Sequence, residues 1–258
     1  MTRCSLTLCL LAAPLTASLA APLAAQQAGA PWDWQLQAPL DLAAPVATIG
    51  LDPDEVTAAD IAALHARGVT TICYVSIGTV EDWRSDATDF APQVIGRDYA
   101  AWPGERFLDL RRADLLVPLM QARFARCAAM GFDAVEPDNM DVHANLSGFA
   151  VTGADVVAYV RTLADIAHGL GLQIGQKNAP DLTADLAPYL DFIITENCLT
   201  DGWCDQIAIY AATGRAILAA EYDIAPDDQP AYCRAALAGG MSMIFKSDDL
   251  DGSGSRCG

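Results

Sequence analysis

The stretch Phe132-Asp133-Ala134-Val135-Glu136-Pro137-Asp138-Asn139-Met140-Asp141 decides the fold, because a short apolar run stops abruptly in three carboxylates. The same pattern returns where 192–195 lead to Glu196 and where 217–220 lead to Glu221. Strands that end in acid deliver carboxylates to one rim of a sheet. Paired carboxylates on a rigid rim indicate acid/base chemistry on a neutral or cationic substrate.

The rest of the chain alternates apolar runs with helical patterns, which predicts a parallel sheet with crossover helices. We expect helices over 57–67, 113–130 and 153–170, and strands at 46–50, 69–75, 107–109, 132–135, 172–175, 191–195, 216–220 and 241–245. Eight such strands predict a single (β/α)8 TIM barrel spanning residues 26–258. A doubly wound sheet is the rival fold. No Gly-x-Gly-x-x-Gly or Walker-type loop follows the first strand, so a nucleotide cofactor has no support and none is expected.

Active sites of such barrels lie at the carboxyl ends of the strands. Polar residues follow nearly every expected strand, at Asp52, Ser76, Asp109, Glu136, Asp138, Lys177, Asn178, Glu196, Asn197, Glu221, Tyr222, Lys246 and Asp248. The long connection 80–106 adds Trp83, Tyr99 and Trp102. These aromatic residues either stack on sugar rings or cap the barrel rim.

The N-terminal residues 1–25 have the pattern of a secretory signal peptide, with Arg3 before an apolar stretch and small residues at Ala20, Ala24 and Ala25. Cleavage near 20–25 would make the protein secreted or periplasmic. An uncleaved membrane anchor is the alternative. No later segment is apolar enough to span a bilayer, so we expect no stable membrane insertion after cleavage.

The formal net charge of −18 repels nucleic acid and anionic lipid. It would attract a polycation, although solubility or adaptation to salt explains the charge equally well. We expect a monomer.

Six cysteines follow the signal segment, and an exported protein sits where disulfides persist. We expect a Cys198–Cys204 bridge beside Glu196, and a second bridge, Cys233–Cys257, that ties down the C-terminal tail. Cys73 and Cys127 fall in an expected strand and an expected helix, and we expect them to be buried free thiols. With three histidines and no zinc-ligand spacing, no metal site is expected.

Several motifs together resemble glycoside hydrolase family 114, the endo-α-1,4-polygalactosaminidases. The resemblance runs from Trp34 to about Tyr222. Its pieces are Tyr74 to Gly78 with Glu81, Trp83, Arg84 and Asp86; Trp102 to Arg106 with Leu108 and Asp109; Gly131 to Asp141 with Asn145, Gly148 and Phe149; Gly171-Leu172 with Lys177-Asn178; Glu196-Asn197-Cys198 with Cys204; and Glu221-Tyr222. The resemblance implies a barrel enzyme that cleaves α-1,4-linked galactosamine polymers with a retaining mechanism.

By match of motif, Asp138 and Glu196 occupy the two catalytic carboxylate positions of that family. We assign Asp138 as nucleophile and Glu196 as general acid/base by analogy with other barrel enzymes that cut α-galactosidic bonds, and the opposite assignment stays open. We expect Lys177 and Asn178 to hold Asp138 ionised, and a more apolar wall to keep Glu196 protonated.

The remaining rim residues have a natural use in binding an amino-sugar polysaccharide. The acids Asp52, Glu136, Asp141 and Glu221 would bind ammonium groups, unless they cap helices or pair with Arg84 or Lys246. Other expected substrate contacts are Tyr74, Trp83, Arg84, Asp109, Lys177, Asn178, Asn197 and Tyr222.

Two other functions stay open on the residues alone. One is a non-catalytic carbohydrate-binding barrel, against which the presence of both key acids argues. The other is a metal-assisted polysaccharide deacetylase or esterase, with oxygen ligands from Asp52, Asp109, Glu136 and Asp138.

Overall fold

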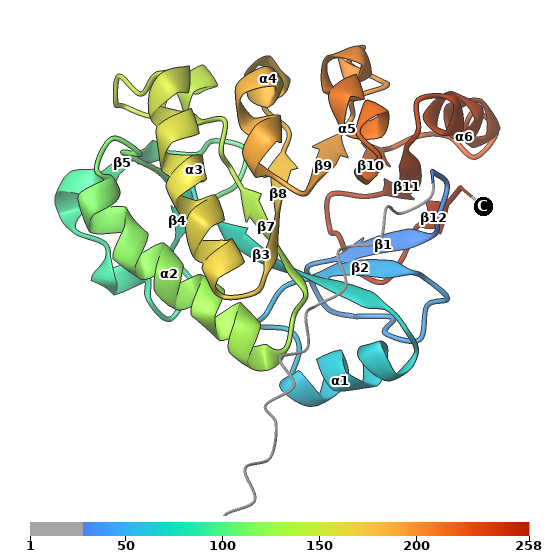
Figure 1. The fold of residues 1–258 in the computed structure, drawn as a ribbon, viewed down its shortest axis with the longest axis horizontal. Coiled ribbons are helices and arrows are strands. Elements are labelled where there is room, and N and C mark those ends of the chain that lie inside the picture. Colours follow the sequence, from blue (N-terminus) through green and yellow to red (C-terminus); the bar gives the residue numbers. More distant parts are fainter. Residues whose placement is uncertain (1–27, 258) are drawn as a thin grey trace, which may run out of the picture.

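The computed structural model describes residues 28–257, so the expected signal segment 1–25 lies outside the described residues. Figure 1 shows strands running through the middle of the molecule with helices around them. The strands are β1 (Trp32–Gln35), β2 (Thr48–Leu51), β3 (Thr70–Ser76), β4 (Thr79–Glu81), β5 (Ile95–Asp98), β6 (Glu105–Leu108), β7 (Ala134–Asp138), β8 (Gln173–Lys177), β9 (Phe192–Glu196), β10 (Ile217–Tyr222), β11 (Ser242–Lys246) and β12 (Ser255–Arg256). The α-helices are α1 (Ala58–Ala66), α2 (Ala113–Met130), α3 (Gly153–Gly169), α4 (Thr183–Leu186), α5 (Ala208–Ala212) and α6 (Gln229–Ala238).

The main sheet has the order β1-β2-β3-β7-β8-β9-β10-β11-β12, and its neighbours pair in parallel except for the short antiparallel β12. The two ends of the parallel run meet. The indole nitrogen of Trp32 on β1 donates to the backbone oxygen of Ser242 on β11 at 3.1 Å. The buried ion pair between Asp33 and Lys246, at 2.6 Å, joins the same two strands. The eight parallel strands therefore form the expected (β/α)8 barrel.

One expected barrel strand is wrong. Residues 107–109 lie at the end of β6, which belongs to a separate three-stranded antiparallel sheet of order β4-β6-β5. The first barrel strand is instead β1, whose four residues are all buried. Its sequence, with Trp32, Asp33, Trp34 and Gln35, has no run of aliphatic residues, so it did not resemble a buried parallel strand. The extra sheet lies in the connection after β3 and builds part of the rim.

The three longer helices begin and end close to where the sequence places them. Thr57 caps α1 and Thr152 caps α3, each in a reciprocal capping box with an aspartate three residues later. Helix α2 ends at Gly131, which adopts the left-handed conformation (φ 96°) that glycine accepts without strain.

The barrel interior is filled by large side chains, including Trp32, Trp34 and Phe192, all essentially inaccessible to solvent. Two glycines on the strands make room for them. A Cβ at Gly50 would lie 2.7 Å from the Trp34 ring, and one at Gly175 would lie 2.6 Å from the Phe192 ring. Trp34 thereby reaches the carboxyl end of the barrel and forms the floor of the site described below.

Three disulfides cross-link the described chain. Cys198–Cys204 and Cys233–Cys257 are present as expected. The expectation of free thiols at Cys73 and Cys127 is wrong, because these two residues form a bridge between β3 and α2. The prediction failed because a strand and a helix separated by 54 residues in sequence become neighbours only when α2 packs on the sheet.

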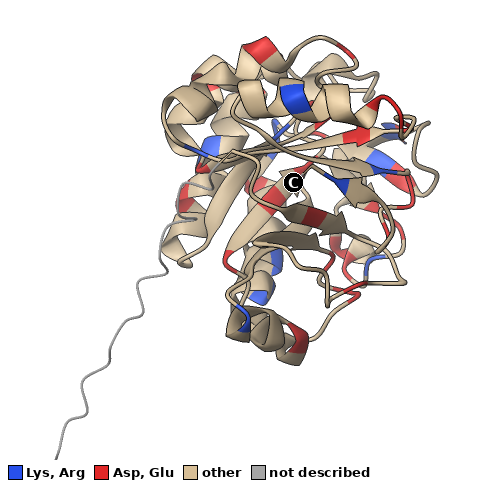
Figure 2. Ribbon diagram, turned by 90° about the vertical axis from the view of Figure 1, so that its right-hand side faces the viewer, with Lys and Arg blue, Asp and Glu red and all other residues tan. Residues whose placement is uncertain are grey.

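The fold carries many more acidic than basic side chains, as Figure 2 shows by colour. Among residues 28–257, no helix is both long and apolar enough to cross a bilayer.

Candidate active site

Four consecutive barrel strands end in the same way. The residue that follows each strand adopts a positive φ, at Asn139 (59°), Asn178 (45°), Asn197 (53°) and Asp223 (56°). Asn and Asp tolerate this left-handed conformation better than other non-glycine residues. Each strand therefore stops sharply after its last side chain, which presents Asp138, Lys177, Glu196 and Tyr222 at one end of the barrel.

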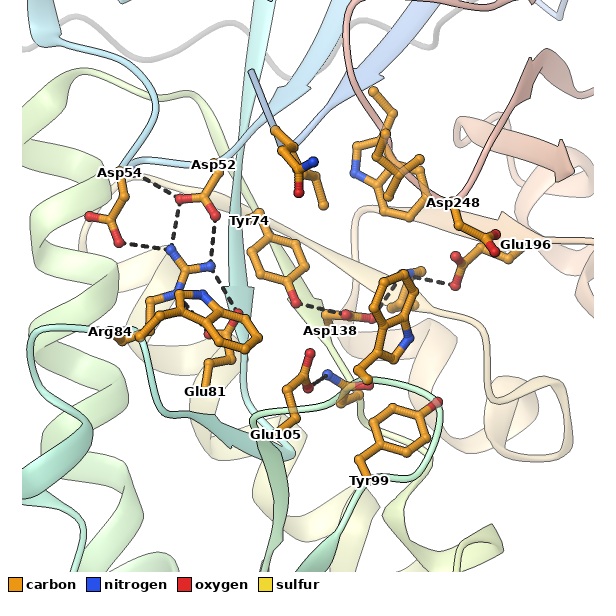
Figure 3. Close-up of a pocket in the computed structure, with 18 of the residues that line it drawn as sticks. Asp52, Asp54, Tyr74, Glu81, Arg84, Tyr99, Glu105, Asp138, Glu196 and Asp248 are labelled. Atoms are coloured by element: carbon orange, nitrogen blue, oxygen red, sulfur yellow. Dashed lines mark hydrogen bonds and ion pairs between the residues drawn. The ribbon is translucent and has the colours of Figure 1, made fainter. Parts of the chain in front are cut away.

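The ammonium group of Lys177 lies between Asp138 and Glu196, both of which are labelled in Figure 3. Its Nζ is 2.8 Å from Oδ1 of Asp138, 3.1 Å from Oε2 of Glu196 and 3.3 Å from Oε1 of Glu136. The Lys177 side chain is only 3% exposed. Burial alone would lower its pKa, but the negative charges of Asp138, Glu196 and Glu136 outweigh burial and raise it. Lys177 is therefore a permanent cation shared by three carboxylates.

Asp138 has two donors. Lys177 binds one of its oxygens, as expected, and the hydroxyl of Tyr74 donates to Oδ2 at 3.0 Å. Burial and the charge of Asp138 raise the pKa of Tyr74 well above its usual value, which keeps the phenol protonated as a donor. Both contacts fix the position of the Asp138 carboxylate.

The surroundings of Glu196 differ from the expectation. Asn178 donates to Oε2 of Glu196 at 2.7 Å, so it serves Glu196 and not Asp138. Tyr222 donates its hydroxyl to Oε1 at 2.6 Å, and Lys177 is also within reach. The expected apolar wall around Glu196 is therefore wrong, because the polar ends of β8 and β10 flank it on both sides.

Glu136 lies beneath this group and has no exposed surface. The Trp34 indole donates to its Oε2 at 2.9 Å, and the Lys177 ammonium sits 4.5 Å above the Trp34 ring. Burial raises the pKa of Glu136 to about 8. Glu136 therefore supports Lys177 from below and is not placed to bind an ammonium group of a substrate.

A cavity of about 770 Å³ opens above the carboxylates. Of the residues expected from the sequence, its wall includes Asp52, Tyr74, Trp83, Arg84, Asp138, Asp141, Lys177, Asn178 and Glu196. Trp83 is 55% exposed, which leaves the face of its indole free for a ligand. The structure thus brings both candidate catalytic acids and most of the expected binding residues to one cavity.

Five expected binding residues do not line that cavity: Asp109, Glu136, Asn197, Glu221 and Tyr222. Asp109 pairs with Arg111 at 2.7 Å, at the end of the strand that does not belong to the barrel. Glu221 is fully buried and accepts from the backbone nitrogens of Leu199 and Thr200 and from the Thr200 hydroxyl. These two acids hold loops in place.

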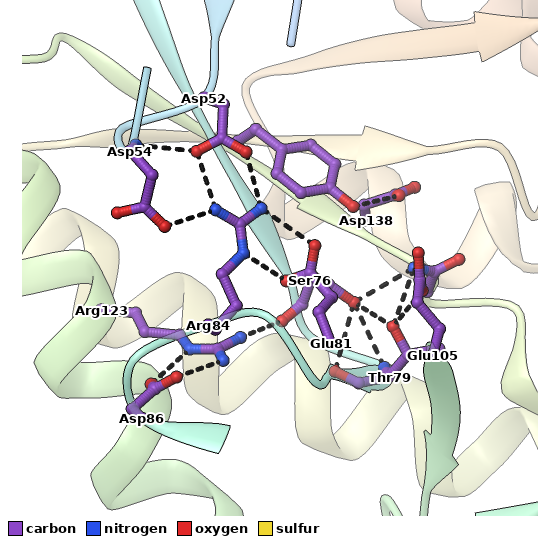
Figure 4. Close-up of polar contacts among 12 residues, drawn as sticks. Asp52, Asp54, Ser76, Thr79, Glu81, Arg84, Asp86, Glu105, Arg123 and Asp138 are labelled. Carbon is purple, nitrogen blue, oxygen red and sulfur yellow. Dashed lines mark hydrogen bonds and ion pairs between the residues drawn. The ribbon is translucent and has the colours of Figure 1, made fainter. Parts of the chain in front are cut away.

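Arg84 gathers three further acids at one end of the cavity (Figure 4). It is within 2.9 Å of Asp52, Asp54 and Glu81. We expected Asp52 either to bind substrate or to pair with Arg84. Its contacts show the pairing with Arg84. Each of these acids has a cationic partner within the protein.

Sequence reasoning placed Tyr99 and Trp102 at the rim, either stacking on sugar or capping it, and Asp248 at a strand end, and all three line the cavity. It did not assign the other wall residues to the site, namely Trp34, Leu36, Gln37, Asp54, Glu55, Glu81, Ser85, Glu105, Asn139, Met140, Asp249 and Leu250. Tyr99, Trp102 and Glu105 lie on the extra sheet and its turns, and the aromatic content of that connection was the available signal. The family resemblance begins at Trp34, but no strand was expected there, so the place of Trp34 in the site was not predicted.

The four acids of the metal hypothesis are not brought together as a ligand set. Asp52 is held by Arg84, Asp109 by Arg111, and Glu136 and Asp138 by Lys177. Within residues 28–257, no group of three or more His, Cys, Asp or Glu side chains is arranged to hold a metal ion.

A TIM barrel with carboxylates gathered at an open polar cavity, at the carboxyl ends of its strands, is an arrangement that barrel glycosidases use. The model of glycoside-hydrolase family GH114 matches residues 12–258, and the chain belongs to this family. No curated protein sequence matches it.

Solved structures agree with the family. The chain is similar to Ega3 from Aspergillus fumigatus, solved with galactosamine, with 28% identity, a TM-score of 0.85, and coverage of 90% of this chain and 96% of the other. It also shares the fold of the glycoside hydrolase domain of PelA from Pseudomonas aeruginosa, with 17% identity, a TM-score of 0.66, and coverage of 88% and 98%. The protein is a glycosidase.

Proposed function

We propose that this glycosidase cleaves α-1,4-linked galactosamine polymers within the chain, with retention of anomeric configuration. The observation that carries the proposal is the sharing of Lys177 by Asp138 and Glu196. Two oxygens that both contact one nitrogen are less than about 6 Å apart, which suits the spacing of about 5–5.5 Å in retaining enzymes better than the wider spacing of inverting ones.

In the first step, an oxygen of Asp138 attacks the anomeric carbon. A bond forms between them while the bond from that carbon to the bridging oxygen breaks, and Glu196 gives its proton to the departing oxygen. In the second step, Glu196 takes a proton from water, the water oxygen attacks the anomeric carbon, and the bond to Asp138 breaks. The enzyme returns to its starting state with one glycosidic bond hydrolysed.

Lys177 has a defined role in this sequence. The proposed first step needs a negative charge on Asp138 and a proton on Glu196, and the Lys177 ammonium contacts both groups. When Asp138 becomes esterified it loses its charge, while Glu196 becomes negative. The ammonium contacts both groups, so it stabilises the negative charge before and after the transfer without moving.

The charge of the cavity supports a cationic substrate. Ten carboxylates line it, at Asp52, Asp54, Glu55, Glu81, Glu105, Asp138, Asp141, Glu196, Asp248 and Asp249, against the two cations Arg84 and Lys177. A wall of this kind attracts ammonium groups and repels anionic polymers. The similarity to Ega3, which was solved with galactosamine, supports the same sugar.

The shape of the cavity supports action within a polymer. In Figure 3 the Arg84 cluster lies to one side of Asp138 and Glu196, and Asp248 is drawn next to Glu196; all of them line the same cavity. A cavity that extends beyond the two carboxylates has room for more than one sugar unit.

The disulfides support the proposed secretion, because bridges persist in oxidising compartments outside the cytosol.

Mass spectrometry of products from partially deacetylated α-1,4-galactosaminogalactan tests the proposal. We expect short galactosamine oligomers from the wild type, and none from Asp138→Asn or Glu196→Gln. An intact polymer would overturn the proposed substrate and favour a carbohydrate-binding barrel. Activity that survives in both variants but disappears in chelator would favour the metal-assisted hydrolase.

A further inference from the structure

The carboxylates of the cavity differ in whether they form an ion pair with a cationic side chain of the protein. Arg84 pairs with Asp52, Asp54 and Glu81, and Lys177 pairs with Asp138 and Glu196. The other five, Glu55, Glu105, Asp141, Asp248 and Asp249, have no ion pair within residues 28–257. Solvent reaches Glu55, Asp248 and Asp249 freely, and Asp141 is half-buried. Glu105 is different, because it is only 6% exposed.

Glu105 is held rigidly beside the reaction centre. Its Oε2 accepts from the Thr79 hydroxyl at 2.6 Å and from the side-chain amide of Asn139 at 3.3 Å. Asn139 directly follows Asp138, and the same amide also contacts Ser76 and Thr79 (Figure 4). The carboxylate is therefore anchored to the residue next to the proposed nucleophile.

The other oxygen of Glu105, Oε1, has no hydrogen-bond partner among residues 28–257. In the described chain, some side-chain polar atoms are inaccessible to solvent and also lack a hydrogen-bond partner. Oε1 of Glu105 is not one of these inaccessible atoms. Because Glu105 lines the cavity, this oxygen is open to it. A buried carboxylate without a cation is costly, and a cationic group of a ligand would remove that cost.

We propose that Glu105 binds the 2-ammonium group of the sugar unit attached to Asp138 during catalysis, and so makes the enzyme select an unacetylated galactosamine at that position. The inference rests on the proposed function. The 2-amine is on the carbon next to the anomeric carbon, so a sugar attacked by Asp138 places it close to Asp138, where Glu105 is anchored.

The selection follows from charge and hydrogen bonding. An ammonium group gives Oε1 both a donor and a positive charge. An N-acetyl group has no charge and brings a bulky acyl group to a buried wall, and a 2-hydroxyl gives a single neutral donor. Burial raises the pKa of Glu105 to about 7, so an uncharged ligand meets either a protonated acid or an unneutralised buried charge.

Binding of monosaccharides tests the inference without requiring hydrolysis. We would measure Kd for galactosamine, N-acetylgalactosamine and galactose by calorimetry, with the wild type, Glu105→Gln and Glu105→Asp. Loss of one partner of a buried ion pair weakens binding at least about 30-fold. We expect Glu105→Gln to lose galactosamine affinity by that factor and to bind galactose nearly as the wild type does. Glu105→Asp keeps the charge and should keep part of the preference for the amine.

Glu55→Gln is the matched control, because it removes the same charge from an exposed part of the cavity wall. A long-range field effect would make both Glu→Gln variants lose the preference for galactosamine equally, and that result would overturn the inference. An unchanged ratio of galactosamine to galactose affinity in Glu105→Gln would also overturn it. If the wild type binds galactosamine and cleaves no polymer, the proposed function fails, and the affinity ratio then tests only whether Glu105 binds the amine.

Discussion

Lys177 donates from its ammonium group to Oδ1 of Asp138 across 2.8 Å, at the carboxyl ends of two neighbouring barrel strands. This contact fixes a full positive charge beside the proposed nucleophile, where almost no solvent screens it. The positive charge of Lys177 therefore interacts more strongly with Asp138 than it would on the surface.

Replacement of this lysine by an apolar residue of similar length should stop the reaction without abolishing the fold. In Lys177→Met we expect kcat on galactosamine oligomers to fall at least about 100-fold, with a smaller change in KM, because the charge acts mainly on the reacting groups. Lys246→Met is the control, since Lys246 is the buried lysine that pairs with Asp33 away from the cavity. It should lower Tm and leave kcat near the wild-type value. A rate for Lys177→Met within a few-fold of wild type would contradict the role of Lys177.

Trp83 offers a large exposed aromatic face to the cavity. Trp83→Ala should raise KM about ten-fold and change kcat little, because stacking on a sugar ring away from the reacting atoms contributes to substrate and transition-state binding equally. Leu237→Ala on α6 removes a similarly exposed apolar side chain and should have no kinetic effect. An unaltered KM in Trp83→Ala would mean that the indole only caps the rim.

The bridge between Cys73 and Cys127 closes a much longer loop than the bridge between Cys198 and Cys204. In the chain-entropy account, its removal by a double Cys→Ala change should cost about 4 kcal/mol of unfolding free energy, against about 2 kcal/mol for the shorter loop. Chemical denaturation of both double variants measures the difference. Equal losses, or a larger loss for the shorter loop, would contradict this ranking.

The raised pKa of Glu105 predicts how galactosamine binding depends on pH. Burial, together with the charges of Glu81 and Asp138, outweighs the lowering effects of Thr79 and Arg84, so the carboxyl is protonated below a pH of about 7. An ammonium group binds the ionised form. The affinity should therefore rise with pH up to about 7, by at most about ten-fold per unit, below the range in which the amine loses its proton. Calorimetry should show this slope in the wild type and a smaller slope in Glu105→Gln; equal slopes would assign the effect to other groups.

Much of the fold could be predicted because parallel strands buried on both faces carry an unmistakable aliphatic run. Strands β9 to β11 have such runs, and helices α1 and α3 have clear N-caps. Strand β1 does not, because its tryptophans fill the barrel interior, where Gly50 on β2 leaves room for the Trp34 ring. The antiparallel sheet β4-β6-β5 was not predicted as a sheet, since its strands are only three or four residues long.

The positions of some cavity residues could be predicted from the sequence, whereas the contacts of others could not. Asp138, Lys177 and Glu196 end strands and could be located from the sequence, whereas their partners depend on side-chain directions. Asn178 turns to Glu196 because its own left-handed backbone points the amide toward β9. Glu136 and Glu221 were expected to reach substrate, but both side chains are buried. Glu136 contacts Lys177, and Glu221 accepts hydrogen bonds from the backbone of residues 199–200.

The configuration of the first-formed reducing end tests the central claim most directly. We would follow hydrolysis of a galactosamine oligomer by ¹H NMR and record the anomeric signals before mutarotation. Attack by Asp138 followed by attack of water inverts the carbon twice, so the account predicts that the α-anomer appears first. A first-formed β-anomer would mean a single displacement by water, and would contradict the role of Asp138 as nucleophile.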